Sequence, residues 1–477
     1  MTLHENFVGG RFVPVAGGDR IDVLNPARDS KISEIPDTGA DGVAEAVATA
    51  KKAQTAWEKL PPIERAGFLR QISAKIRSNA DEIARVISEE QGKILPLATV
   101  EAHFTANYID YMAEWARRIE GEILPSDRAG ESIFLFRQPV GVVAGILPWN
   151  FPFFLIARKM APALITGNAI VIKPSEETPN NAALFARLVT ETELPEGVFN
   201  IVYGRGATTG KALVTHQDVR MVSFTGSVET GSRIMADGAK NITKMNLELG
   251  GKAPAIVTAD ADLDLAARAI TQSRTLNTGQ VCNAAERVYV DRSVSAEFTQ
   301  KLVAAMKAVR YGDPLAGDEL DMGPIINRAG LDKIDTLVKS AVSEGAEVAL
   351  GGKAADLGQG NHYEPTVLVN CRQDMQIIRN ETFGPVLPLI EVSGLDEAIE
   401  RANDTTYGLT SSIYTTKLND ALRACHELKF GETYVNRENF EAMQCFHAGR
   451  GKSGIGGADG KHGLLEYTET HIAYIQT

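Results

Sequence analysis

One cysteine of this sequence stands in a setting that suits a nucleophile. Cys282 lies in the string Asn277-Thr-Gly-Gln-Val-Cys282-Asn-Ala, where Gly279 and polar neighbours indicate a loop rather than the centre of a strand. A thiol of ordinary pKa is only a few per cent thiolate near neutrality, yet the thiolate is the best nucleophile that a protein offers. Because a lone cysteine is more often a small buried apolar residue, this segment alone leaves both interpretations open.

A carboxylate is the candidate general base. Glu248, in Leu247-Glu-Leu-Gly-Gly-Lys252, ends an apolar strand and precedes two glycines, which is a poor place for a surface role. We expect partial burial to raise its pKa, so that it can take a proton from water. The alternative is a structural glutamate that caps the strand or pairs with Lys252.

An asparagine in a stiff loop is the candidate oxyanion donor. Asn150 lies between aromatic residues and prolines in Pro148-Trp-Asn-Phe-Pro152. A buried amide without partners costs about 1–3 kcal/mol, so its NH2 group must donate to something. Either it satisfies the backbone of its own loop, or it donates to the oxyanion that forms when a thiolate attacks a carbonyl carbon.

Three segments that follow predicted strands are typical of dinucleotide binding. The run Gly204–Gly210 differs from the glycine fingerprint by one residue, and Phe224–Gly231 joins a strand to a helix whose N-terminal N–H groups can receive a pyrophosphate. In the string 171–176, Lys173 and Glu176 can hold ribose hydroxyls. An anionic Glu176 repels a 2′-phosphate, which favours NAD over NADP. The plainer alternative is an exposed salt bridge at a helix start.

The elements around these residues alternate between strands and helices. Helical periodicity is expected over 44–60 and 63–92. Short apolar runs then alternate with helix-length segments, which predicts two α/β units with parallel sheets and a site in the crevice between them. The runs are Val142–Leu147, Ala169–Ile172, Phe199–Val202 and Met221–Phe224, followed in a second series from Ala253 by Val288–Val290 and Val367–Val369.

Two further strands, Ala129–Arg137 and Ile472–Gln476, belong to neither series. Exposed edge strands tend to pair with another chain, so they predict a homo-oligomer. The uncharged stretch Pro139–Ala157 has the length of a membrane span, but its prolines would break a spanning helix. We expect a buried strand, a rigid loop and a helix start there, and no membrane partner.

Composition narrows the function classes. A net charge of −12 argues against a nucleic-acid partner. The four cysteines are scattered and show no zinc-ligand spacing, so neither a disulfide framework nor a metal site is expected. Residues 1–10 contain no apolar run of the kind a signal peptide needs. Together these features favour a cytoplasmic, reduced setting.

Taken in order, the strings PWNFP, KPSE, FTGS, LELGGK, GQVCN and Glu381-Thr-Phe-Gly-Pro385 resemble the aldehyde dehydrogenase superfamily over essentially the whole chain. The resemblance implies an α/β fold with a Rossmann-like NAD-binding domain (1–118 and 139–248) and an α/β catalytic domain (249–450). It also implies a small β oligomerisation unit built from 119–138 and 451–477, in a homotetramer or dimer.

The same resemblance implies roles for individual residues. Cys282 attacks an aldehyde, Asn150 and the Cys282 backbone N–H hold the oxyanion, hydride passes to NAD, and Glu248 activates the water that hydrolyses the thioester. Glu381, with Phe383 nearby, would hold the nicotinamide ribose. The full set of cofactor residues implied is Leu147, Trp149, Lys173, Ser175, Glu176, Gly206, Phe224, Thr225, Gly226, Ser227, Leu249, Glu381 and Phe383.

Within the superfamily, the strings Asn150–Lys159, Asn436–Gln444 and Phe446–Gly449 are most similar to bacterial enzymes for short hydroxyaldehydes such as lactaldehyde and glycolaldehyde. The implied substrate residues are Arg158, Asn283, Glu441 and His447, polar groups that are costly to bury without partners. The alternative is that Arg158 and Glu441 pair with one another to hold the loop. Another polar or sugar-derived aldehyde, or a semialdehyde, is the alternative substrate.

Two functions other than hydrolysis to an acid are alternatives for this sequence. Transfer of the acyl group to coenzyme A would not need the base that Glu248 supplies. A binding or structural protein on an inactive scaffold predicts loss of Asn150, Glu248 or Cys282, and all three residues are present. Both observations favour hydrolysis to a carboxylic acid.

Overall fold

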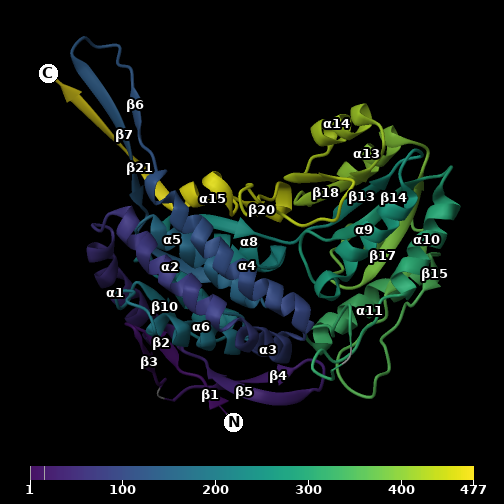
Figure 1. The fold of residues 1–477 in the computed structure, drawn as a ribbon, viewed down its shortest axis with the longest axis horizontal. Helices are drawn as coiled ribbons and strands as arrows, with labels where there is room; N and C mark the ends of the chain where they lie inside the picture. The colour runs from purple at the N-terminus through teal and green to yellow at the C-terminus, as the bar shows by residue number, and fades with distance from the viewer. Residues whose placement is uncertain (1, 16, 318) are drawn as a thin grey trace.

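The computed structural model describes residues 2–15, 17–317 and 319–477, and it is an α/β protein (Figure 1). The first large sheet runs in the order β20-β12-β11-β8-β9-β10-β2-β3, and β10, β9, β8, β11 and β12 are parallel to one another. The strands are β2 (Asn6–Val8), β3 (Arg11–Val13), β8 (Val142–Ile146), β9 (Ala169–Lys173), β10 (Phe199–Ile201), β11 (Val219–Thr225), β12 (Lys244–Glu248) and β20 (Gly454–Ile455).

Helices pack on this sheet, which is why β8 and β9 are buried at every residue. They are α1 (Gly39–Trp57), α5 (Pro152–Ile165), α6 (Asn180–Thr190), α7 (Lys211–Thr215) and α8 (Val228–Gly238). A further layer, which packs on α5 and α6, consists of α2 (Pro62–Ser78), α3 (Ala80–Gln91) and α4 (Leu95–Ala113). The expected long helix over 63–92 is two helices, because Asn79 leaves helical geometry with φ −120° and ψ 19°.

The second large sheet runs in the order β15-β16-β17-β14-β13-β18-β19 and is parallel except at its β15 edge. Its strands are β13 (Ala253–Val257), β14 (Ala285–Asp291), β15 (Glu347–Leu350), β16 (Thr366–Val369), β17 (Val386–Val392), β18 (Thr410–Tyr414) and β19 (Glu432–Val435). Its helices are α9 (Leu263–Thr275), α10 (Ser295–Lys307), α11 (Arg328–Ser343), α12 (Gln376–Arg379), α13 (Leu395–Asn403) and α14 (Leu418–Glu427).

Two smaller sheets complete the fold. One is β1 (Thr2–Leu3), β5 (Ser30–Pro36) and β4 (Arg20–Asn25), at the N-terminal end. The other is β21 (Thr468–Gln476), β7 (Glu131–Pro139) and β6 (Glu122–Leu124), an arm that extends away from both large sheets (Figure 1). Both strands expected outside the two units therefore lie in this arm, paired along their whole length.

The sheets differ from the expected domain boundaries in one place. The segment 451–477 was assigned to the oligomerisation unit, but β20 pairs with β12 in the first sheet through Leu247–Ile455 and Glu248–Gly454. The reason is that β12 is an edge strand with free backbone groups, and the returning chain satisfies them before α15 (Gly460–Glu466) packs on α5. Only β21 of this segment belongs to the arm.

The uncharged stretch 139–157 forms the end of β7, then β8, a loop and the start of α5. Pro152 is the first residue of α5, where a proline costs no hydrogen bond. In the described part of the chain, no helix combines the length and the apolar character that crossing a membrane requires.

Candidate active site

A cavity of about 430 Å³ lies between the two large sheets and is lined from both. Its walls come from α4, the loop 148–151, α5, the end of β11, and the loops 280–283, 325–333, 381–383 and 440–441. Loops at the carboxyl ends of parallel strands meet there, as in other open α/β sheets. The expected site residues in the lining are Trp149, Asn150, Arg158, Thr225, Gly226, Ser227, Leu249, Cys282, Asn283, Glu381, Phe383 and Glu441.

Cys282 lies in a tightly turned loop between α9 and β14. Asn277, Thr278 and Gly279 all have positive φ, at 48°, 60° and 74°. A Cβ on Gly279 would lie 2.4 Å from the carbonyl oxygen of Gly384, so only glycine fits there. This loop presents Cys282, which is partly exposed, to the cavity.

Burial raises the pKa of the Cys282 thiol, and His447 partly offsets that rise. The pKa of His447 itself is well above its usual value, because Glu441, Cys282 and Glu432 together outweigh the cost of burying its charge. His447 Nδ1 lies 2.7 Å from Glu432 Oε1. The raised pKa of His447 and its lowering effect on the pKa of Cys282 both favour the thiolate.

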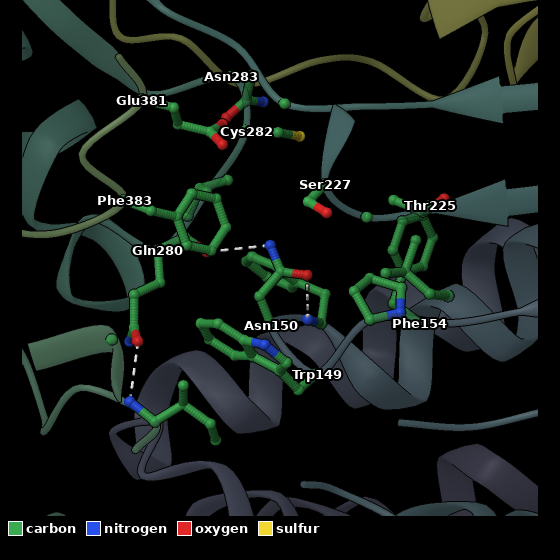
Figure 2. A pocket seen from close by; sticks show the side chains of 18 of the residues that line it. Trp149, Asn150, Phe154, Thr225, Ser227, Gln280, Cys282, Asn283, Glu381 and Phe383 are labelled. Carbon is green, nitrogen blue, oxygen red and sulfur yellow. Dashed lines mark hydrogen bonds between the residues drawn. The ribbon is translucent and has the colours of Figure 1, made fainter. Parts of the chain in front are cut away.

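Asn150 is held beside the cysteine loop by bonds to both ends of its side chain (Figure 2). Its Nδ2 donates to the carbonyl of Gln280 at 3.0 Å, and its Oδ1 accepts from the N–H of Phe151 at 3.1 Å. The bond to Gln280 satisfies loop backbone, as the plainer interpretation expects. An amide NH2 carries two hydrogens, so one remains for an oxyanion.

A buried ion pair that sequence reasoning missed lies behind Asn150. Lys93 and Glu101 contact one another with both side chains fully buried. Lys93 Nζ donates to the carbonyl of Asn150 at 2.8 Å, and Glu101 Oε1 accepts from the N–H groups of Phe153 and Phe154 at 3.0 and 3.1 Å, at the start of α5. The pair thus fixes both sides of the loop that carries Asn150.

Glu248, at the end of β12, is an anion rather than an acid of raised pKa. Burial raises its pKa, but Arg158 and Lys159, whose nitrogens lie 3.8 and 3.6 Å from its oxygens, outweigh burial and lower the pKa to about 2. The expectation of a raised pKa was wrong because it did not include Arg158 and Lys159. Both lie on α5, far from Glu248 in the sequence. Pairing with Lys252 was also wrong, since Lys252 Nζ donates to Glu286 at 2.6 Å.

The second oxygen of Glu248 accepts from Thr225 Oγ1 at 2.6 Å, while Oε1 has no hydrogen-bond partner among the described residues. Glu248 is turned toward Lys159 and does not belong to the cavity lining, although Leu249 does. A buried carboxylate oxygen without a donor is costly and calls for a water or ligand.

The candidate substrate residues form one polar network. Arg158 Nε donates to Asp459 Oδ1 at 3.0 Å and Nη2 bonds the other oxygen, while Glu441 Oε1 lies 3.6 Å from Nη1. Asn283 Nδ2 donates to Glu441. Arg158 and Glu441 are therefore close, as the alternative interpretation expects, but the main partner of Arg158 is Asp459. Sequence reasoning missed Asp459, because it lies 301 positions from Arg158.

The expected cofactor residues divide into two groups. Trp149, Thr225, Gly226, Ser227, Leu249, Glu381 and Phe383 line the cavity, whereas Leu147, Lys173, Ser175, Glu176, Gly206 and Phe224 lie outside it along the first sheet. Lys173 Nζ lies 3.2 Å from Glu176 Oε2, and Glu176 Oε1 accepts from Gly206 N at 3.5 Å. The salt bridge of the plainer interpretation is thus present, and Glu176 remains partly exposed at the sheet edge.

Among the expected cofactor residues that line the cavity, Glu381 makes several close contacts. Its Oε1 accepts from the N–H of Gly251 at 2.8 Å, and a Cβ on Gly250 would lie 2.5 Å from Oε2. Burial and the neighbouring Glu286 raise the pKa of Glu381 to about 7. The ring of Phe383, which has φ 58°, meets Trp149 edge to face with centroids 5.6 Å apart. The lack of a side chain at Gly250 lets the Glu381 carboxylate pack directly against the backbone here.

Three features define the class of this protein. A helix N-terminus at Ser227 follows a strand of a parallel sheet, the Cys282 loop lines the same cavity, and the carboxylate of Glu248 is buried nearby. The aldehyde dehydrogenase family model matches residues 12–473, and the chain belongs to this family. It is an aldehyde dehydrogenase, an oxidoreductase. In the described chain, no group of three or more His, Cys, Asp or Glu side chains is placed to hold a metal ion.

Within this family, the chain is similar to several known dehydrogenases. The chain is 60% identical to lactaldehyde dehydrogenase of Escherichia coli, over 99% of each chain. A crystal structure of that enzyme superposes with a TM-score of 0.99 and full coverage of both chains. The structure of 3,6-anhydro-L-galactose dehydrogenase in complex with NAP, 42% identical, superposes with a TM-score of 0.97 over 99% of this chain and 100% of that one.

Proposed function

We propose that this aldehyde dehydrogenase oxidises short hydroxyaldehydes, such as lactaldehyde and glycolaldehyde, to carboxylates with NAD. The observation that carries the proposal is one cavity in which the cysteine nucleophile stands directly beside hydroxyl-binding groups. Cys282 and Asn283 are adjacent in the lining, and Glu441 contacts Asn283. The similarity to lactaldehyde dehydrogenase supports the same substrate class.

The hydroxyl-binding groups are acceptors. Asn283 Oδ1 is buried and makes no hydrogen bond within the described residues, and Glu441 adds a carboxylate. A buried acceptor without a donor costs free energy that a substrate hydroxyl recovers. An aldehyde lacking that hydroxyl leaves the acceptor unsatisfied, so plain aldehydes bind less well.

The chemistry starts at the sulfur. The Cys282 thiolate forms a C–S bond to the carbonyl carbon, and the second N–H of Asn150 with the Cys282 backbone N–H holds the oxyanion. Collapse of this thiohemiacetal restores the C=O bond and expels hydride with two electrons. A bound nicotinamide cofactor supplies the hydride acceptor. The product on the enzyme is a thioester of Cys282.

Glu248 then takes a proton from water, which attacks the thioester carbon, and the C–S bond breaks to release the acid and the thiolate. The carboxylate is ionised and therefore ready to act as a base, but Lys159 holds it away from the cavity. We infer that Glu248 turns toward the sulfur for this step. Its unpartnered Oε1 is the oxygen that is free to do so.

The residues present fit a nicotinamide dinucleotide. Gly206 has open space where a Cβ would stand, Glu381 lines the cavity, and Ser227 starts α8 with N–H groups for a pyrophosphate. Lys173 and Glu176 would hold one ribose and Glu381 the other. The charge of Glu176 supports NAD over NADP, because a 2′-phosphate there would meet a carboxylate.

The arm supports a homo-oligomer, either a tetramer or a dimer. Its side chains Ile123 and Tyr474 are 77% and 67% exposed, which is unusual for apolar residues on a paired sheet. The NAD-binding, catalytic and oligomerisation units then correspond to the first sheet, the second sheet and the arm.

The test is a substrate panel without coenzyme A or phosphate. Purified protein is assayed for NADH formation with glycolaldehyde, lactaldehyde, acetaldehyde and propionaldehyde. We expect kcat/KM to be roughly tenfold or more higher for the hydroxylated member of each matched pair. Equal values would remove the hydroxyl preference, and a requirement for coenzyme A would replace hydrolysis by acyl transfer.

A further inference from the structure

Arg158 is a buried cation in the wall of the cavity, yet its guanidinium is already occupied. Asp459 bonds it with both carboxylate oxygens, Oδ1 to Nε at 3.0 Å and Oδ2 to Nη2. This two-point geometry is the one that a guanidinium offers to any carboxylate, including that of a substrate. The side chains of Arg158 and Asp459 are 5% and 2% exposed, so water weakens the pair little.

The carboxylates around Arg158 leave no unbalanced positive charge there. Glu441 and Glu248 approach it at 3.6 and 3.8 Å, so three carboxylates of the described residues surround this guanidinium. Lys159 lies beside Glu248, and His447 lies beside Glu432. These two neighbouring groups therefore also have carboxylate partners, and the carboxylates around Arg158 outnumber it. A further carboxylate entering the cavity would increase the anionic excess.

The backbone fixes Asp459 in this position. It lies between β20 and α15 with φ 69° and ψ 166°, a conformation that is rare for any residue with a side chain. Its carbonyl accepts the N–H of Gly463, and a Cβ on Gly463 would lie 2.4 Å from the carbonyl carbon of Ala458. A residue held in so costly a conformation, with its carboxylate bonded to the cavity-lining Arg158, indicates a role at the site.

We propose that Asp459 is a specificity-determining residue: by occupying Arg158, it makes the cavity accept neutral aldehydes and reject aldehydes that carry a second carboxylate. The proposal rests on the function proposed above and narrows it, because it separates hydroxyaldehydes from dicarboxylic semialdehydes. Burial raises the pKa of Asp459 to about 6, so the group is ionised at neutral pH and above. Without this negative charge, Arg158 would be the natural anchor for a substrate carboxylate.

The experiment compares two substrates of one shape. Succinate semialdehyde and its neutral amide, 4-oxobutanamide, differ only at the end remote from the aldehyde. We expect the wild-type enzyme at pH 8 to oxidise the amide with a kcat/KM roughly tenfold or more above that of the acid. Faster oxidation of the acid by the wild-type protein would overturn the proposal, whatever any variant does.

The variant Asp459→Asn removes the charge and keeps the shape. We expect it to favour the acid over the amide relative to wild type, chiefly through a lower KM for the acid, and the double variant Asp459→Asn/Arg158→Gln to lose that gain. The control Glu466→Gln, which removes an anion from the same helix α15 near Lys244, should leave the ratio of acid to amide unchanged. An unchanged ratio in folded Asp459→Asn would overturn the proposal.

Glycolaldehyde, measured in parallel, separates the two claims. If wild type oxidises glycolaldehyde well and shows no charge discrimination, only the role of Asp459 fails. If wild type prefers the acid to glycolaldehyde itself, the proposed function fails as well.

Discussion

The ammonium group of Lys159 lies 3.6 Å from a carboxylate oxygen of Glu248, with both side chains buried behind the cysteine loop. Lys159 also donates to Thr225 Oγ1 at 2.9 Å, and Thr225 in turn donates to Glu248. The proposed base is therefore held in an ion pair rather than as an acid of raised pKa. This arrangement keeps the carboxylate ionised at every pH at which the enzyme is assayed.

A first prediction concerns pH dependence. Because the pKa of Glu248 is lowered to about 2, we expect that protonation of this residue does not limit turnover between about pH 5 and pH 9. Replacing Lys159 by Met removes one of the charges that hold the pKa down, so the acid limb of the kcat profile should move to higher pH. An acid limb that is the same in both proteins would show that Lys159 does not set the ionisation of Glu248.

A second prediction concerns Glu381, whose pKa is raised to about 7 by burial and Glu286. Above that pH the residue is a carboxylate that accepts ribose hydroxyls, and below it the neutral acid accepts them less strongly. The KM for NAD should therefore increase as the pH falls from 8 to 6. In Glu381→Gln this pH dependence should disappear; if it persists, another group causes it.

The sign of the stability effect follows from the same shift. A carboxyl group whose pKa is raised by folding favours the folded state at low pH and opposes it once the pH exceeds the unfolded pKa. Glu381→Gln should therefore raise the melting temperature more at pH 8 than at pH 5. The opposite order in a thermal scan would contradict the raised pKa.

A third prediction concerns the ion pair behind Asn150. Lys93→Met leaves Glu101 as an unpaired buried charge, which costs about 3–5 kcal/mol of stability. It also removes a donor to the carbonyl of Asn150, so kcat should fall while KM for the aldehyde changes little. Lys93→Arg, which keeps the charge, should recover part of both losses. A stability loss with kcat unchanged would reduce the pair to a purely structural role.

A fourth prediction concerns the choice of cofactor. Glu176→Gln removes the charge that faces a 2′-phosphate, so the ratio of kcat/KM for NAD to that for NADP should fall by roughly tenfold or more. The matched control is Glu191→Gln at the residue after the end of α6, an exposed partner of Lys75. If the ratio in Glu176→Gln stays at the control value, Glu176 does not select the cofactor.

Strand and helix order were predictable from the sequence because the runs 142–147, 169–172 and 221–224 are almost entirely apolar, as a strand buried on both faces requires. The expected runs correspond to β8, β9 and β11, with ends shifted by up to two residues. The break at Asn79 was not predictable, because the apolar spacing of α2 and α3 continues across it. Neither was the pairing of β20 with β12, which joins segments about 200 residues apart.

The same distinction applies to the site. That Cys282 and Asn150 belong to one site could be inferred from the ordered motifs, and both line the cavity, while their chemical roles stay predictions. The ionisation of Glu248 could not, since it depends on Arg158 and Lys159 on another element. The residues next to Asp459 in the sequence do not indicate its role, because that role depends on the guanidinium of Arg158, which is distant in the sequence.

The measurement that tests the central claim most directly is the intact mass of Glu248→Gln after mixing with NAD and glycolaldehyde. With the base removed, hydrolysis stops at the thioester, so we predict one NADH per enzyme in a single rapid phase and a glycolyl adduct on the peptide that contains Cys282. Cys282→Ala, treated in the same way, should show neither. Sustained turnover of Glu248→Gln without an adduct would contradict the account, because it would mean that the reaction needs neither the proposed thioester nor Glu248 as its base.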